Sequence, residues 1–241
     1  MKTATARKPG PQVAAASPEA INEAFARLFT LKDTGATELI LACSAEPDYV
    51  AAGRSKDPWD PPLTEKGRCQ AMRLAMRLRT MDITAVFTST MRQALETSTY
   101  IAAARDLPMV RVRQLREIEF DAAKLAARAA DGQKLAAELA IRFLNGPRWD
   151  SLPGFEPSRQ FRNRVVQALE GILAHHPGER VVVVTHGGVI NAYLSMLLDI
   201  PRDMFFLPEH ASISVVRSLR DLTTVQRLND FAHLLPTFNA R

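Results

Sequence analysis

The sequence predicts an α/β protein, a three-layer αβα sandwich with a mostly parallel central sheet. Short apolar segments of strand length alternate with helical patterns along most of the chain, which favours parallel strands between layers of helices. The clearest strand, residues 180–185, is an almost continuous run of valine, as expected of a strand covered on both faces. No internal repeat and no linker divides the 241 residues, so we expect a single core.

An N-terminal region precedes this pattern. Residues 1–17 carry basic residues, alanine and proline without a hydrophobic signal core, and we expect them to form a disordered tail. Ser17, Pro18 and Glu19 form a typical helix start, in which a capping side chain is followed by a proline and an acid. This start predicts a helical extension over residues 18–36.

The domain itself is expected over residues 37–235. In its first half, apolar runs predict strands and apolar residues at helical spacing predict helices, in the order strand 38–42, helix 64–79, strand 85–88, helix 91–104 and strand 109–112. An alanine-rich helical insertion follows at about 121–156, its helix at about 121–143. The second half continues with helix 158–175, strand 180–185, helix 187–198 and two strands joined by a turn, 212–217 and 223–228.

Composition and charge argue against several classes of function. The formal net charge of +5 is spread along the chain, without the dense basic run or the basic and aromatic stripe that indicates nucleic-acid binding. No apolar run reaches the roughly 18 residues that a membrane span needs. Cys43 and Cys69 form no CxxC pair, so we expect no disulfide framework and a cytoplasmic location. We also expect no cofactor and no metal site.

The residues at the strand ends indicate where the chemistry should lie, because open α/β sheets bind ligands beyond the carboxyl ends of their strands. His186 follows the valine-rich strand and precedes Gly187 and Gly188, which open the next helix. This order places free backbone N–H groups beside an imidazole, an arrangement suited to an anion. A structural histidine on a tight turn is the alternative.

Five segments, in order along the chain, resemble motifs of the histidine phosphatase superfamily, the phosphoglycerate mutase-like proteins. Residues 184–190, VTHGGVI, resemble the motif of that family's second histidine. Residues 60–71, DPPLTEKGRCQA, resemble its D-x-P-L-T-x-x-G-x-x-Q-A segment. Residues 89–97 resemble the start of the next helix, 115–118 the segment with the general acid, and 211–214 a late strand. The resemblance implies a phosphoglycerate mutase-like fold.

The resemblance also implies which site residues to expect. Members of the family use a histidine nucleophile in an R-H-G motif after the first strand, while two arginines and the second histidine hold the phosphate. In this chain Cys43 stands at the first arginine, Ser44 at the nucleophile and Gln93 at the second arginine. Only Glu117, at the general acid, and His186, at the second histidine, keep the family's residue types.

The sequence leaves two functions of the site open. It therefore also leaves open whether the chain is an enzyme. A serine hydroxyl attacks phosphorus poorly unless a base activates it, and each lost arginine removes a bidentate phosphate clamp. These losses favour a pseudophosphatase that acts by binding a ligand or a partner. The alternative is an active phosphomonoesterase with altered chemistry, in which Ser44 is the nucleophile and His186 its base. A third hypothesis is a scaffold whose N-terminal helix mediates assembly.

The candidate catalytic residues are therefore Ser44, Glu117 and His186. The candidate ligand-binding residues are Cys43, Gln93, Arg92, Gly187 and His210. Of these, Arg92 either swings toward the site or faces solvent, and His210 is expected near the late strand. The candidate partners are a small anionic or phosphorylated ligand, a protein partner and a second copy of the chain in a homodimer.

Overall fold

The computed structural model describes residues 17–30, 35–53, 59–121, 123–124, 132–220 and 222–235. Two compact units make up the chain, Met1–Thr34 and Gly35–Arg241. The first contains helix α1 (Pro18–Thr30), where the Ser17 hydroxyl accepts the Ala20 N–H at 3.2 Å, as the predicted capping residue should. Apart from Ser17, the predicted tail lies outside the described residues.

The second unit is built on one sheet, whose described strands have the order β3-β2-β4-β1-β5-β6. They are β1 (Thr37–Cys43), β2 (Ala85–Ser89), β3 (Met109–Val112), β4 (Arg180–Thr185), β5 (Ile213–Leu219) and β6 (Leu222–Asp230). β1 to β4 run parallel to one another, whereas β5 is antiparallel to β1 and pairs with β6 as a hairpin. The predicted mostly parallel sheet is therefore confirmed.

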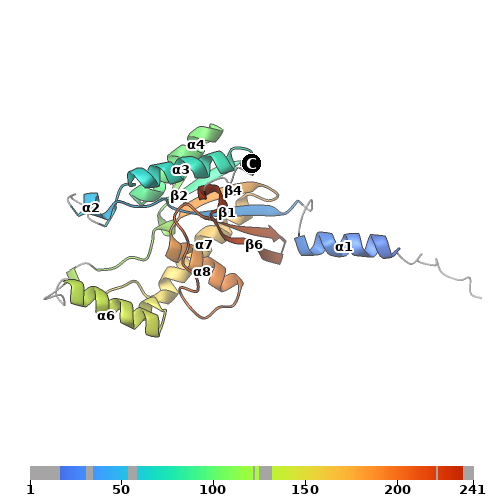
Figure 1. Ribbon diagram of the computed structural model, residues 1–241. Coiled ribbons are helices and arrows are strands. Elements are labelled where there is room, and N and C mark those ends of the chain that lie inside the picture. Colours follow the sequence, from blue (N-terminus) through green and yellow to red (C-terminus); the bar gives the residue numbers. More distant parts are fainter. Residues whose placement is uncertain are drawn as a thin grey trace, which may run out of the picture. The chain divides into compact units, whose positions relative to one another are not determined.

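Helices cover both faces of this sheet (Figure 1). α3 (Glu65–Leu78) and α4 (Arg92–Arg105) pack on one face, and α7 (Ser158–His175) and α8 (Gly187–Leu197) on the other. Successive residues of a strand point to opposite faces, so Leu39 and Leu41 join the core beneath α7 and α8, while Ile40 and Ala42 join the core beneath α3 and α4. All four side chains have no exposed surface, which explains why the central strands are apolar at every position.

The remaining described helices are short or lie in the insertion. α2 (Tyr49–Ala52) follows β1, and α6 (Gly132–Asn145) lies within the predicted insertion. Three further turns of 3-10 helix, absent from the sequence prediction, are Arg113–Leu115, Trp149–Ser151 and Ala232–Leu234. The continuous helix expected at 121–143 falls partly outside the described residues, and α6 ends two residues later than expected. None of the described helices is long and apolar enough to cross a membrane.

Candidate active site

A cavity of about 290 Å³ lies at the carboxyl ends of the parallel strands. It forms there because β1, β4 and β2 are neighbours in register, with Cys43 beside Thr185 and Val184 beside Thr88, so that the residues after each strand converge. Seven of the eight predicted site residues line it, namely Cys43, Ser44, Gln93, Glu117, His186, Gly187 and His210.

The residues after β1 are fixed by backbone hydrogen bonds. Ser44 N–H donates to the Thr185 carbonyl at 2.7 Å, and the Ser44 carbonyl accepts the Ala211 N–H at 3.2 Å. His210 Nδ1 lies 3.3 Å from the same carbonyl, which holds this ring at the cavity. These bonds tie the end of β1 to the loops after β4 and before β5. Ser44 therefore sits at the floor of the cavity with only 4% of its surface exposed.

Cys43 is a thiol rather than a thiolate at neutral pH. Burial, together with the negative charges of Glu117 and Glu209, raises the pKa of its thiol to about 12. Because the thiolate is the nucleophilic form of cysteine, this residue is a poor nucleophile.

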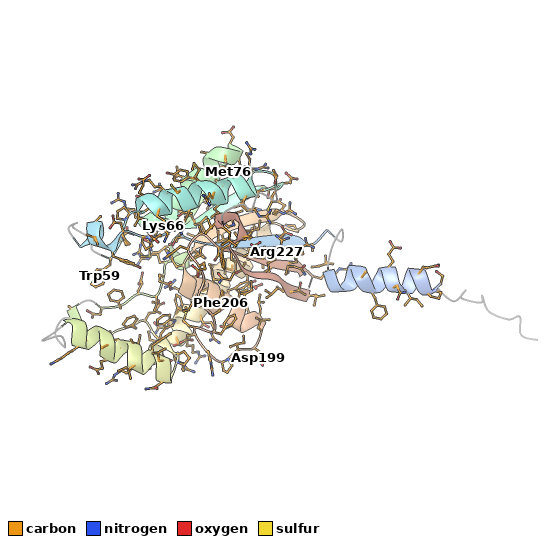
Figure 2. All side chains as sticks on the ribbon, viewed as in Figure 1. Trp59, Lys66, Met76, Asp199, Phe206 and Arg227 are labelled. Carbon is orange, nitrogen blue, oxygen red and sulfur yellow. The ribbon has the colours of Figure 1, made fainter. Side chains whose placement is uncertain are left out.

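The motif at residues 60–71 shapes the turn after β1. Thr64 caps α3 by accepting the Gly67 N–H at 2.8 Å. A Cβ on Gly67 would lie 2.3 Å from the Glu46 carbonyl oxygen, so only glycine allows this close approach. Gln70 Oε1 in turn accepts the Glu46 N–H at 3.0 Å, and Lys66 Nζ lies 2.6 Å from Glu46 Oε2. These motif residues hold the wall of the site, and Figure 2 labels Lys66 on α3.

His186 is buried and engaged by a serine other than Ser44. Its Nε2 lies 2.8 Å from Ser89 Oγ, at the end of β2. Burial, together with the positive charges of Arg116 and Arg164, lowers the pKa of His186 to about 3, so the ring is neutral at neutral pH. The Ser44–His186 pair needed for a serine nucleophile is not among the hydrogen bonds of the described residues. Sequence reasoning missed Ser89, although it stands in a segment that matched the family.

Glu117 is held by backbone donors. Its Oε2 accepts the Gly188 N–H at 2.8 Å and its Oε1 accepts the Ile118 N–H at 2.9 Å. A Cβ on Gly188 would lie 2.2 Å from Glu117 Oε1, so the second glycine of the motif makes room for the acid. Burial raises the pKa of Glu117, and the two hydrogen bonds and Arg164 offset that only in part. Burial is therefore the main cause of the raised pKa of Glu117.

Arg164 supports the acid from outside the cavity, and nothing in the sequence pointed to it. Its guanidinium donates to the carbonyls of Gln114, Arg116 and Glu117 at 2.7 to 3.0 Å, and to Glu156 at 2.7 Å. It thereby fixes the loop that carries Glu117.

Arg92 and Gln93, adjacent at the start of α4, lie in different surroundings. Arg92 does not line the cavity, because its exposed guanidinium donates to Glu96 at 2.8 Å, and its N–H donates to Asp60 at 2.6 Å. Gln93 lines the cavity, is 6% exposed, and its Oε1 has no hydrogen-bond partner among the described residues. Of the two alternatives for Arg92, the structure therefore shows the one that faces solvent.

Thr97 links α4 to the end of β1. Its Oγ1 donates to the Gln93 carbonyl at 2.7 Å and accepts the Ala45 N–H at 3.0 Å, where the residue after Ser44 is fully buried. The two hydrogen bonds of Thr97 together fix the position of Gln93 relative to Ser44.

Four aromatic side chains that sequence reasoning missed, Tyr49, Trp59, Phe120 and Phe155, line one side of the cavity, and we call them the aromatic wall. The Trp59 and Phe120 rings meet edge to face, with centroids 4.6 Å apart, and those of Phe120 and Phe155 are 5.3 Å apart. Figure 2 labels Trp59, which precedes α3. Tyr49 opens the four-residue helix α2 and the other three residues lie outside helices, so no periodic pattern indicates a common surface.

The described residues contain no group of three or more His, Cys, Asp or Glu side chains that could hold a metal ion.

Similarity to known proteins supports the resemblance stated above. Residues 39–231 match the family model of the histidine phosphatase superfamily (branch 1). The metal-independent phosphoserine phosphatase of Arabidopsis thaliana is 30% identical over 201 residues, which are 82% of this chain and 83% of that protein. Phosphoglycerate mutase-like protein 4 of the same plant is 31% identical over 214 residues, which are 87% of this chain and 92% of that protein.

Solved structures agree with this similarity. YhfR of Bacillus stearothermophilus has a TM-score of 0.69 at 28% identity, with 83% of this chain and 100% of that chain covered. A phosphoglycerate mutase from Bacillus anthracis str. Sterne has a TM-score of 0.64 at 20% identity over 83% of this chain and 95% of that chain, which supports the fold alone. This chain therefore belongs to the histidine phosphatase superfamily and has the phosphoglycerate mutase-like α/β fold.

Proposed function

We propose that this chain is a pseudophosphatase, a member of its family that binds a ligand or a partner in the cavity without transferring a phosphoryl group. One observation carries the proposal. Among the described residues, no lysine or arginine side chain lines the cavity. Phosphoryl transfer depends on groups that neutralise the charge of the phosphate, so a cavity without cations stabilises its transition state poorly.

The size of the missing charge effect supports the proposal. Removing one preorganised donor from a transition-state site typically costs about 3 to 4 kcal/mol. The resemblance places arginines at two positions that here hold Cys43 and Gln93, so two such contributions are absent. Together they correspond to a loss of roughly four to six orders of magnitude in rate.

The available nucleophiles support the same proposal. Ser44 lacks an activating base, because His186 Nε2 is engaged by Ser89 at 2.8 Å and a ring whose pKa is lowered to about 3 is a weak base. Burial keeps Cys43 protonated. Neither side chain has the activation that nucleophilic catalysis requires.

An active phosphomonoesterase with altered chemistry is the second candidate, and it is favoured by relatives whose names include phosphoserine phosphatase. In that case the His186 ring would leave Ser89 and accept the Ser44 proton. Ser44 Oγ would then attack phosphorus, the alcohol of the ester would leave with a proton from Glu117, and water would hydrolyse the phosphoserine intermediate to inorganic phosphate. For either function we propose a cytoplasmic location, as predicted from the cysteine content.

The test is hydrolysis of p-nitrophenyl phosphate and of a panel of phosphate monoesters that includes phosphoserine. The native chain, Ser44→Ala and His186→Ala are compared at equal concentration. The proposal predicts that all three release phosphate at the rate of the buffer blank, and that no phosphoenzyme forms. Turnover by the native chain that disappears in both variants would establish the second candidate.

A further inference from the structure

The sign of the charge at the cavity indicates what kind of ligand it takes. Glu117 contributes the one carboxyl group among the described lining residues, and no lysine or arginine there balances it. The charge of Glu117 acts on both Cys43 and Tyr49, where, after burial, it contributes to the raised pKa of each. The described lining residues therefore offer one carboxyl group and no lysine or arginine, which opposes a phosphate dianion. Burial disfavours the charged form of Glu117, and a cation bound beside it would favour that form.

The positive charges of Arg116 and Arg164 act on His186, but neither arginine side chain lines the cavity. Arg164 is held by Glu156 and by three backbone carbonyls. Arg116 lies 3.5 Å from Glu119. Neither side chain lines the cavity, so neither offers a donor to a ligand.

The aromatic wall supplies a second and independent preference for a cation. Tyr49 and Trp59 line the cavity and are 70% and 55% exposed, so both side chains are accessible from solvent. The face of an aromatic ring is negative, and a cation within about 6 Å of it is attracted. Several rings around one carboxyl group form a typical site for a methylated ammonium group, since the rings contact the methyl groups while the carboxylate supplies the counter-charge.

We propose that the cavity binds a small organic cation of the quaternary ammonium class, with Glu117 as its counter-ion and the aromatic wall around its methyl groups. A volume of about 290 Å³ limits the ligand to a few carbon atoms around one charged centre. The inference rests on the proposed function, because a cavity that hydrolyses phosphate esters selects the opposite charge. It replaces the anionic ligand that the family resemblance implies.

The experiment is calorimetric titration of the full chain with choline and with its uncharged analogue, in which carbon replaces the quaternary nitrogen. The two compounds have the same shape, so the difference between them measures the preference for charge. We expect choline to bind about tenfold more tightly, the size of a cation–π and counter-ion contribution of about 1.4 kcal/mol. In Glu117→Gln the preference should disappear, whereas Glu119→Gln, an exposed acid outside the cavity, should keep it.

A second variant guards against loss of the fold, since Glu117→Gln replaces one carboxylate acceptor of a backbone N–H with an amide NH₂ group. Trp59→Leu changes an exposed ring, and it should weaken choline more than the uncharged analogue. Equal affinity for the two compounds, or binding of neither, would overturn the inference. Neither result would contradict the proposed pseudophosphatase function. Inorganic phosphate binding more tightly than choline would also overturn it. Phosphatase turnover that depends on Ser44 would instead refute the proposed function, whatever choline does.

Discussion

The contact between Gly188 and Glu117 makes a quantitative prediction. A Cβ added at Gly188 would lie 2.2 Å from Glu117 Oε1 and 3.0 Å from Cδ, so either the acid or the start of α8 must move. Displacement breaks the hydrogen bond from Gly188 N–H to Oε2, which is 2.8 Å long. Losing that bond costs about 1–3 kcal/mol, and the forced shift of packed atoms costs about 1–3 kcal/mol more. The gain from replacing a helical glycine with alanine is at most about 1 kcal/mol. Gly188→Ala should therefore destabilise the fold by roughly 1–5 kcal/mol.

The assay is urea denaturation followed by far-UV circular dichroism, with Gly171→Ala as the matched control. Gly171 lies within α7, and an added Cβ there would meet nothing within 4 Å, so this variant should be more stable by about 0.5–1 kcal/mol. A double-mutant cycle with Glu117→Ala isolates the contact, because the cost of Gly188→Ala should shrink once the carboxyl group is gone. Equal stability changes for the two glycine variants, or an unchanged cost in the Glu117→Ala background, would refute this reasoning.

Three further predictions concern stability. Thr97→Val should cost about 1–3 kcal/mol in chemical denaturation, because the buried Ala45 N–H loses its acceptor, whereas Thr99→Val on the exposed side of α4 should change stability by less than about 0.5 kcal/mol; similar values for the two would contradict it. Burial raises the pKa of Glu38, but hydrogen bonds from two arginines at 2.5 and 2.8 Å outweigh burial and leave the pKa below its ordinary value, so Glu38→Gln should destabilise by about 1–3 kcal/mol at neutral pH. That loss should fade in acid, where the native carboxyl group is itself protonated, and a loss independent of pH would count against the ion pairs. His186 has a folded pKa of about 3, below the ordinary 6.5, so its unfolded form binds a proton that its folded form does not. The native chain should therefore lose stability relative to His186→Gln as the pH falls from 6.5 toward 3, by up to about 1.4 kcal/mol per pH unit, and parallel stability curves would show that the ring is not buried in its neutral form.

The regular elements could be predicted because their signals are local. The apolar run at Arg180–Thr185 needs burial on both faces, and Thr64 can cap only the helix that follows it, so β4 and α3 were found at their observed positions. The short helix α2 was missed, since four residues carry no periodic pattern. The antiparallel pairing of β5 with β1 was also missed, because strand direction within a sheet is settled by contacts far apart in the chain.

Site residues could be predicted where they stand in a motif of the family. Contacts between segments that are far apart in the chain could not be predicted. Seven of the eight named residues line the cavity, and five of them end or follow a parallel strand or open a helix at one edge of the sheet. The exception is Arg92, since neighbouring residues at the start of a helix point in different directions, and the side chain that faces the cavity is Gln93. Ser89 as the partner of His186 depends on β2 lying beside β4, which the order of the sequence does not reveal.

The most direct test of the account restores the missing charge. The triple variant Cys43→Arg, Ser44→His, Gln93→Arg places the family's residue types back on three side chains that face the cavity, while the supporting residues Glu117 and His186 stay as they are. Hydrolysis of p-nitrophenyl phosphate is measured for this variant and the native chain, with circular dichroism to verify that both are folded. The account predicts that the native chain is silent and that the folded variant turns over and forms an acid-labile phosphohistidine. A native chain that hydrolyses the substrate as fast as the variant, through Ser44, would contradict it.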